Sequence, residues 1–351
     1  MIKRKNKEPK APKPKKAPLK VRWNSFWERN RKSEKNYLLK KKMWDIFYRL
    51  CRGILVFGLC FLILQPLLTK ISLSFMEEQD LYDSTVISIP RHFSVSSYTL
   101  AWKMLKGIKA FGTSLMLSLI VALAQVVSCT LVGYGFARFK FPLKNFWFGC
   151  VILVIIVPPQ TLFAPYYIWF SNFDILGICK LLTGHTVKLL GSLWPYLLMC
   201  LGCAGYKSGL YIYLLRQHFR NEPKELEEAA YVDGCSKLRT FVQILLPGAA
   251  PIITSCFLFS FVWQWTDVTY SQLFFSRVNG WNTVTNGLST LVNHLDTYYK
   301  SLNGSSYAIS TAFGNQVLST GMLLAIIPLL IIYVFAQKNF VESLSSTGIK
   351  G

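Results

Sequence analysis

The sequence predicts an all-α membrane protein with six transmembrane helices. Of its 351 residues, 52% are hydrophobic and only 16% are charged, so the chain is more apolar and less charged than an ordinary soluble domain. Six runs contain no Asp, Glu, Lys or Arg, and about 20 apolar residues suffice to cross the hydrocarbon core of a bilayer. Basic residues gather in one terminal segment and in alternate connections between these runs.

The six apolar runs define the expected spans. They cover residues 53–69, 111–137, 145–173, 189–206, 240–266 and 301–337. The last run begins with a polar stretch and becomes strongly apolar only from Val317. The fourth run continues past Lys207 into the apolar segment GLYIYLL, so its end stays open.

Residues 1–45 are expected to form a basic, disordered tail ahead of a membrane domain at 46–351. Its first part, MIKRKNKEPKAPKPKKAPLK, is rich in Lys and Pro and has almost no apolar residue, so it cannot bury a core. It lacks the cleavage pattern of an ordinary signal peptide, so we expect it to be retained. We interpret it as an arm attracted to anionic lipid headgroups; the alternative is a nucleic-acid-binding arm.

The distribution of positive charge predicts the orientation. Six crossings place both termini on one side of the membrane. If that side is the cytoplasm, the inner segments hold 30 Lys and Arg residues, with Lys207 among them, and the outer segments hold nine. The positive-inside rule therefore predicts that both termini are cytoplasmic, and that the connection between the fourth and fifth runs is a cytoplasmic loop.

This loop has the pattern of two short helices, at about residues 221–246. The segment NEPKELEEAAYVDG offers Asn221 as an N-cap, an acidic first turn and a helix that ends at Gly234. The segment CSKLRTFVQILL predicts a second helix that stops at Pro247. A helical hairpin that only connects two spans would explain the caps. It would not explain the small residues Ala229, Ala230 and Gly234, which would let a partner approach closely.

The same loop resembles the signature of binding-protein-dependent ABC importer permeases. That signature reads E-A-A, three residues, Gly, nine residues, I-x-L-P, and the chain matches it at every spacing. The resemblance implies a type I importer fold in which this loop docks into a cytoplasmic ATPase, with Glu228 meeting a basic residue, the alanines packing closely and the glycine permitting the turn. The implied ATPase-coupling residues are Glu228, Ala229, Ala230, Asp233, Gly234, Ile244, Leu246 and Pro247.

Other segments resemble the carbohydrate-uptake group, and most of all the smaller permease subunit of maltose-type transporters. They are YGFARFKFPLKN, VPPQTLFAPYYIWFSNFDILG, LLRQHFRNEPKELEEAAYVDG, WQWTDV and the terminal FVESLSSTGIKG. The resemblance implies a bacterial plasma-membrane protein that moves a sugar, specifically an oligosaccharide. The implied partners are a second permease, two ATPase subunits and an extracellular solute-binding protein. The basic arm and the segment 171–205 are longer than is usual in this family.

No pattern for catalysis, a cofactor or a metal stands out. The four histidines are scattered, and GYKS at 205–208 lacks the earlier glycine and the strand of a phosphate-binding loop. Cys200 and Cys203 form a CxxC inside an apolar run, where small packing residues are expected rather than a redox or metal site. We therefore expect ATP to be hydrolysed by a partner subunit.

The fifth run carries a candidate translocation path. Gln264 and Asp267 are one helical turn apart, and Trp263 and Trp265 flank Gln264. An acid at the end of a membrane span marks a lined cavity or a protein partner, and polar groups beside aromatic faces suit a sugar. The alternative is that the tryptophans are interfacial anchors and that Asp267 is already in water.

The outer connection at 276–316 is long and polar, and the alternatives there remain open. Its segment SRVNGWNTVTNG resembles the part of the maltose-type subunit that enters the binding protein, which implies contact residues Asn279, Gly280, Trp281 and Asn282. A solvated loop is the other interpretation. For the whole chain, the alternatives to sugar import are import of another solute, such as a polyamine or phosphate, and a membrane scaffold or sensor without transport.

Overall fold

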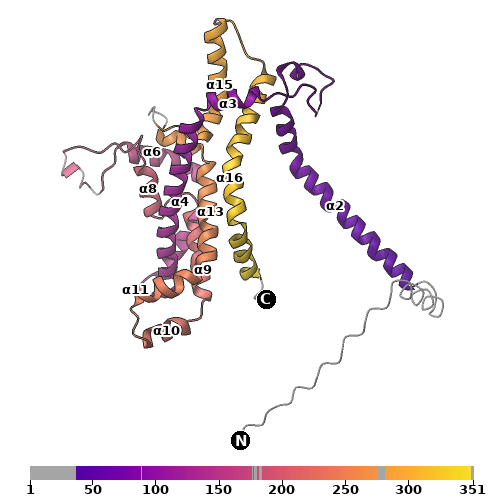
Figure 1. Ribbon diagram of the computed structural model, residues 1–351. Helices are drawn as coiled ribbons and strands as arrows, with labels where there is room; N and C mark the ends of the chain where they lie inside the picture. Colours follow the sequence, from indigo (N-terminus) through magenta and orange to yellow (C-terminus); the bar gives the residue numbers. More distant parts are fainter. Residues whose placement is uncertain are drawn as a thin grey trace. The chain divides into compact units, whose positions relative to one another are not determined.

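A computed structural model describes residues 37–87, 89–175, 177, 180–181, 184–275 and 281–348, and it confirms the all-α prediction (Figure 1). The described residues contain helices, loops and two isolated β-bridges, Met76 with Phe93 and Phe173 with Val187, but no strand. The first 36 residues of the expected basic tail lie outside them.

The chain divides into two units, Met1–Leu68 and Thr69–Gly351. The described part of the first unit belongs to α2 (Tyr37–Ser74), a helix of 38 residues. Its stretch Met43–Ser74 is long and apolar enough to cross a membrane. This helix contains the first expected span, and it begins within the segment that we expected to be tail.

The second unit is built around α4 (Gly107–Arg138), which corresponds to the second expected span. This helix packs against α8 (Trp194–Leu201), α9 (Ser208–Asn221) and α13 (Ala250–Trp265). A Cβ on Gly133 would lie 2.9 Å from Leu215 Cβ, so glycine allows the close approach of α4 and α9. A core of aromatic and aliphatic side chains fills the space between α4, α9 and the fifth expected span.

Two expected spans are bent. The third consists of α5 (Lys144–Ile156), then η2 (Pro159–Leu162) and α6 (Phe163–Ser171), with a bend of 101° between the two parts. Pro158 and Pro159 lie at this bend; proline lacks the N–H that a helix needs and pushes the residue before it out of helical geometry.

The fifth span is bent by 74° between Lys237–Gly248 and α13. Its first part comprises three short helical elements: α11 (Lys237–Thr240), η3 (Phe241–Leu245) and α12 (Leu246–Gly248). The predicted stop at Pro247 is correct to within one residue, because this part ends at Gly248. The turn η3 is a π-helix in which Leu246 N–H bonds to Phe241 O, and proline is tolerated in the first turn of the segment that follows.

The fourth expected span, residues 189–206, is not a single helix. It contains α8, and the apolar continuation past Lys207 forms the separate helix α9. Between them Cys203 and Lys207 adopt left-handed backbone conformations, with φ of 55° and 63°. A left-handed residue ends a regular α-helix, which explains the break.

The six-span count is therefore not confirmed. Within the described residues, three helices are long and apolar enough to cross a membrane, or up to five if each bent pair is one span. The third unbroken one is the stretch Thr311–Gln337 of α16 (Thr311–Gly348). It starts later than the sixth expected run, because residues 301–303 still belong to the preceding helix.

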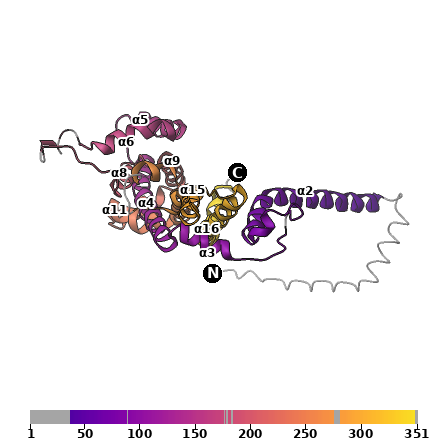
Figure 2. The same cartoon turned by 90° about the horizontal axis from the view of Figure 1, so that it is seen from above.

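Shorter elements connect the spans. They are η1 (Glu78–Leu81), α3 (Ser96–Met104), α14 (Thr269–Phe275) and α15 (Val284–Asn303). Of these, α3 and α15 lie at the end of the bundle where α4 begins (Figure 1). Seen from above, α15 lies beside α16 (Figure 2). The segment 276–316 was expected as a loop, yet it contains the 20-residue helix α15. This helix packs with α3 and α16 around Leu291 and Leu295, which are fully buried.

Candidate functional site

A cavity of about 320 Å³ lies in the second unit. Its walls come from α4, η2, the first residue of α6, α8, the α8–α9 break, the end of α13 and the start of α14. Three of the four residues predicted for a translocation path line it, namely Trp263, Gln264 and Asp267. The sequence therefore located one wall of the cavity.

Asp267 is held by donors from the protein. Its Oδ2 accepts hydrogen bonds from Tyr196 Oη at 3.1 Å, from Ser271 N at 2.9 Å and from Ser271 Oγ at 3.2 Å, and its Oδ1 accepts one from Tyr270 N at 3.1 Å. These bonds make Asp267 the cap of α14. A carboxylate has about four acceptor positions, so this one is already occupied by its own helix and by α8.

Gln264 and Trp263 have unused binding capacity. The Gln264 Nε2 atom is buried and has no hydrogen-bond partner among the residues that the structure describes. The Trp263 side chain is 44% exposed and meets Tyr206 edge-to-face, with ring centroids 5.3 Å apart. An amide donor beside aromatic rings is the arrangement that the hydroxyls and apolar face of a sugar require.

Trp265 does not join this group. It is 2% exposed, and its Nε1 donates to Ala325 O of α16 at 3.1 Å. Residues two apart on a helix point in nearly opposite directions, so Trp263 and Trp265 cannot share one face. Trp265 is a core residue between α13 and α16, and its burial also excludes an interfacial anchor.

Gln125 is the polar centre of the cavity wall, and the sequence did not indicate it. Its Nε2 donates to Tyr206 O at 2.7 Å and to Ser208 Oγ at 2.8 Å, and its Oε1 accepts from Ser260 Oγ at 2.5 Å. It therefore ties α4 to the α8–α9 break and to α13. The only signal in the sequence was an amide inside the apolar run 111–137.

Lys207 lies at the break between α8 and α9, beside two residues that line the cavity. Its neighbours Tyr206 and Ser208 are bonded to Gln125, which is close to the middle of the spanning helix α4. The Lys207 Nζ atom lies 5.2 Å from the centroid of the Tyr206 ring and 5.5 Å from that of Trp263. These distances are those of cation–π contacts.

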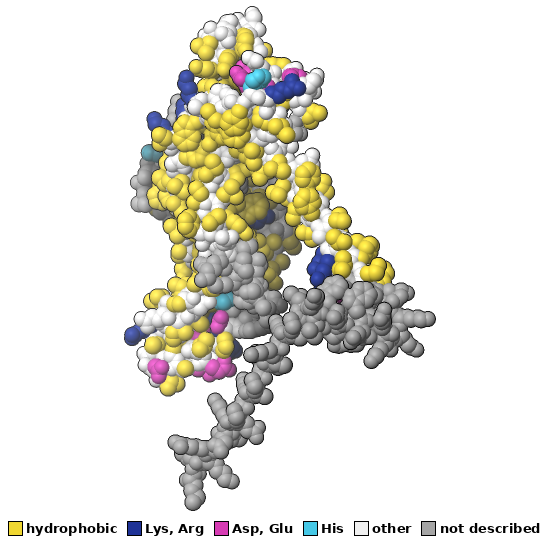
Figure 3. All heavy atoms as spheres, turned by 45° about the vertical axis from the view of Figure 1, so that its right-hand side comes forward, with side chains coloured by type: hydrophobic (Ala, Val, Ile, Leu, Met, Phe, Trp, Pro, Cys, Tyr) yellow, Lys and Arg dark blue, Asp and Glu magenta, His cyan; other side chains and the backbone are white. Residues whose placement is uncertain are grey.

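The predicted coupling loop forms a separate site, beside the C-terminal end of α4. Its first helix is α10 (Glu225–Val232), and acidic side chains gather on this end of the molecule (Figure 3). The prediction that Asn221 caps α10 is wrong, because Asn221 is the last residue of α9. Pro223 explains this: the residue before it, Glu222, is extended, with ψ of 136°.

Most of the predicted docking residues face outward. Glu228, Ala229, Asp233 and Pro247 are exposed, Ile244 and Leu246 are half-buried, and Ala230 is buried. Gly234 is also exposed and has φ of 81°, the left-handed region that favours glycine. After it, Ser236 caps α11 by accepting a hydrogen bond from Arg239 N.

An ion pair fixes the loop to α4. Arg138 Nε lies 2.6 Å from Glu227 Oε1, and both side chains are largely buried, at 7% and 12% exposure. Arg138 Nη2 also donates to Glu222 O at 2.9 Å. The sequence analysis counted Arg138 only as a charge, although its place at the end of an apolar run, beside an acidic loop, was a usable signal.

The predicted contact for a binding protein is described only in part. Asn279 and Gly280 lie outside the described residues. Trp281 is half-buried and stacks on Phe275, with centroids 5.3 Å apart and ring planes 11° apart, while Asn282 is exposed. Trp281 therefore packs against its own chain.

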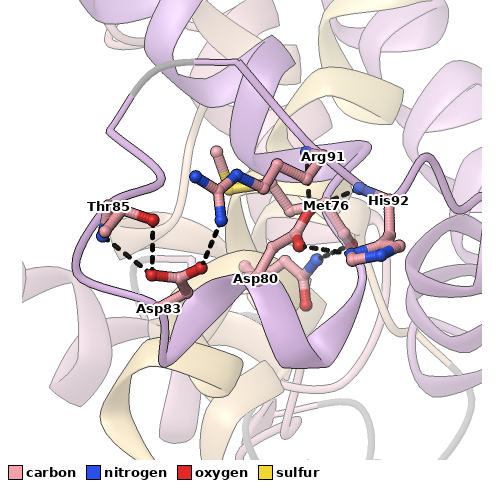
Figure 4. A network of polar contacts seen from close by, with 7 residues as sticks. Met76, Asp80, Asp83, Thr85, Arg91 and His92 are labelled. Atoms are coloured by element: carbon pink, nitrogen blue, oxygen red, sulfur yellow. Dashed lines mark hydrogen bonds and ion pairs between the residues drawn. The ribbon is translucent and has the colours of Figure 1, made fainter.

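A polar cluster that the sequence did not predict lies between η1 and α3 (Figure 4). Asp80 is 3% exposed and accepts from His92 Nδ1 at 2.8 Å, His92 N at 2.8 Å and Arg91 N at 2.9 Å. These hydrogen bonds, those from His92 above all, lower the pKa of Asp80, and the same carboxylate raises the pKa of His92. Nearby, Arg91 pairs with Asp83 at 2.9 Å. Across the described ranges, no group of three His, Cys, Asp or Glu residues could hold a metal ion.

Comparisons with known proteins agree with this arrangement. The family described as binding-protein-dependent transport system inner membrane component matches residues 129–346. The arabinooligosaccharides transport system permease protein AraQ of Halalkalibacterium halodurans is 25% identical over 243 residues, which is 69% of this chain and 74% of that protein. The sn-glycerol-3-phosphate transport system permease protein UgpE of Pectobacterium atrosepticum is 25% identical over 288 residues, which is 80% of this chain and 90% of that protein.

The fold also matches a solved structure. A bacterial ABC transporter involved in the import of the acidic polysaccharide alginate aligns with a TM-score of 0.61 and 18% identity, over 84% of this chain and 97% of that chain.

Proposed function

This chain belongs to the family of binding-protein-dependent transport system inner membrane components, and we propose that it is the permease subunit through which an ATP-driven importer moves a sugar, specifically an oligosaccharide. The family match covers the coupling loop and the residues of α13 that line the cavity. Relatives named for arabinooligosaccharide transport and a structural neighbour that imports alginate support the substrate class.

The single observation that carries the proposal is the exposed, acidic surface of the coupling loop. Glu228 and Ala229 point outward from α10, and Gly234 sets the turn beside them. A solvent-exposed surface of small and acidic residues on a short rigid helix suits a basic cleft in an ATPase. ATP hydrolysis would then occur on that partner.

The loop has a mechanical connection to the cavity. Residues 237–248 continue through one bend into α13, which ends with Trp263 and Gln264 at the cavity. The Arg138–Glu227 ion pair links the same loop to α4, which carries Gln125. A displacement of the loop by the ATPase would thus move two walls of the cavity, as alternating access requires.

We expect the chain to work in a plasma membrane with a second, different permease, two ATPase subunits and an extracellular binding protein. Both termini and the coupling loop would be cytoplasmic. If Lys207 is not counted with the cytoplasmic segments, these segments still hold most of the Lys and Arg residues. The positive-inside rule therefore still predicts this orientation.

Co-purification tests the proposal. An affinity tag on this chain should recover an ATPase and a second permease, and sugar-loaded binding protein should stimulate the ATPase several-fold in proteoliposomes. Stimulation by a loaded binding protein for a non-sugar solute would reassign the substrate. Recovery without any ATPase would refute the importer and favour a scaffold.

A further inference from the structure

Lys207 is a charged residue at a depth where charges are costly. The backbone on both sides of it is tied to Gln125, through Tyr206 O at 2.7 Å and Ser208 Oγ at 2.8 Å. Gln125 is 18 residues from the start of α4 and 13 from its end, so it lies near the middle of a spanning helix. Ionisable groups at such depth face a cavity or a partner and mark functional sites.

Lys207 has no anionic partner among the residues that the structure describes. None of the ion pairs between described residues includes it. Of the described residues that line the cavity, only Asp267 is a carboxylate. Its oxygens already accept from Tyr196, from Tyr270 N and from both donors of Ser271. The positive charge at the cavity is therefore not neutralised from within the described structure.

The aromatic rings position the ammonium group without satisfying its donors. Tyr206 and Trp263 line the cavity, and the Nζ atom lies 5.2 and 5.5 Å from their ring centroids. A cation–π contact attracts the charge to the ring faces, but an ammonium has three N–H donors and no hydrogen bond from Nζ occurs within the described part of the chain. The N–H donors of Lys207 are thus held in place and remain free to bind a negatively charged acceptor.

We propose that Lys207 selects a solute that carries a negative group, a carboxylate or a phosphate, so that the imported sugar is an acidic one. This inference rests on the proposed import function. The anion would meet the Lys207 ammonium, the sugar ring would lie against Trp263 and Tyr206, and the Gln264 amide would donate to a ring hydroxyl. A neutral sugar could accept hydrogen bonds from the ammonium, but only an anion would also neutralise its charge, and ion pairing is stronger away from bulk water.

The test uses the complete transporter, with both permeases, the ATPases and its own binding protein, in proteoliposomes. Uptake is measured for matched pairs: digalacturonate against its dimethyl ester for the carboxylate, and glucose 6-phosphate against glucose for the phosphate. The variants are Lys207→Gln, which removes the charge at similar length, and Lys207→Arg, which keeps it. The control is Lys103→Gln, since Lys103 Nζ lies 5.0 Å from the Tyr298 ring centroid in a comparable contact away from the cavity.

The wild-type transporter should import the anionic solute of at least one pair in preference to the neutral solute of the same pair. Lys207→Gln should raise the concentration for half-maximal uptake of that solute about tenfold or more. Lys207→Arg and Lys103→Gln should stay close to wild type. Uptake of neutral members only, or an unchanged half-saturation in Lys207→Gln, would overturn the anion inference and leave sugar import intact. No uptake of any pair, together with no ATPase stimulation, would overturn both.

Discussion

At the scale of single residues, the Arg138–Glu227 pair differs from the other ion pairs between described residues because both of its side chains are largely buried. Taking two charges out of water costs several kcal/mol, so such a pair contributes little net stability while it is intact. Removal of one partner leaves the other charge buried and alone. The pair therefore fixes the position of the coupling loop more than it strengthens the fold.

We expect Arg138→Gln and Glu227→Gln each to lower the free energy of unfolding by about 3 kcal/mol, and the double variant to lose less than the sum. Denaturation of the purified chain in detergent measures this. The Lys300–Asp296 pair, at 2.6 Å on α15 and with side chains 42% and 29% exposed, provides the control, since Lys300→Gln should cost under about 1 kcal/mol. Equal and additive losses in all variants would show that Arg138 and Glu227 are not coupled.

The Asp80–His92 contact gives the chain a pH dependence with a definite sign. The pKa of His92 is raised above its usual 6.5, so its contribution to stability is complete below that value and is lost as pH rises through the folded pKa. The pKa of Asp80 is lowered below 3.8, so its contribution is present above that value and is lost only in stronger acid. Between these limits both contributions are present.

The apparent Tm of the detergent-solubilised chain should therefore fall as pH rises from 6 to 8.5. His92→Gln should flatten this decline, because glutamine does not titrate. His294→Gln is the matched control and should retain the slope of the wild type. An identical slope in His92→Gln would assign the pH dependence to other groups.

At the scale of elements, the sequence was informative about where helices exist and poor about where they break. Each of the six apolar runs contains helix, but the third was expected as one span, although Pro158 and Pro159 at the bend between α5 and η2 were a usable signal. The break between α8 and α9 contains no proline, and its signals in the sequence are Gly202 and Gly205, the second in the segment GYKS that reads as a helix end. Its left-handed residues are Cys203 and Lys207, whose side chains do not favour that conformation; tertiary contacts through Gln125 hold it.

The candidate sites follow the same pattern. Local spacing brought together Trp263, Gln264 and Asp267, which line one cavity, because one turn of chain contains them. The coupling loop remains a prediction from its resemblance to a family signature. Gln125 and Arg138 were missed, since their partners lie more than 80 positions away. Trp265 was assigned to the path because it is close to Gln264 in the sequence. That closeness does not show that its side chain points to a different side of the helix from Trp263.

The turn between α10 and α11 depends on Gly234. Its φ of 81° is strained for any residue with a Cβ, and no atom lies within 4 Å of the position that a Cβ would take. The penalty for Gly234→Ala is thus one of backbone conformation, about 1 kcal/mol. That is small against the stability of the fold, but it acts on the angle between the two helices that would enter the ATPase.

We expect Gly234→Ala to reduce ATP-coupled uptake several-fold while expression holds. Gly234→Asn should be milder, because asparagine tolerates the left-handed region. Gly248→Ala is the matched control: it also has open space around its Cβ position, and it has no positive φ. Uptake reduced equally by Gly248→Ala and Gly234→Ala would indicate a general effect of the loop and not the turn.

At the scale of the whole molecule, the number of crossings decides on which side of the membrane each terminus lies. Five crossings would put the termini on opposite sides, and six would put them together. The described residues give three unbroken spans and two bent pairs, so the outcome depends on whether α8 and α9 together complete a crossing. The contact of Gln125 with the α8–α9 break supports this, because it places the break at mid-depth beside α4. From there, the 14 residues of α9 extend about 21 Å along the spanning helix.

Labelling with a membrane-impermeant maleimide tests this arrangement. In a chain without native cysteines, a cysteine at Asp233 should react only after the cells are permeabilised, and one at Ser305 should react in intact cells. Reporter fusions at either end of the chain should both register the cytoplasm, because α8 and α9 complete a sixth crossing and basic residues are retained inside. Reporters on opposite sides would show that this pair enters the membrane and returns. The cavity beside Lys207 would then lie in a re-entrant segment and would open to only one side of the membrane.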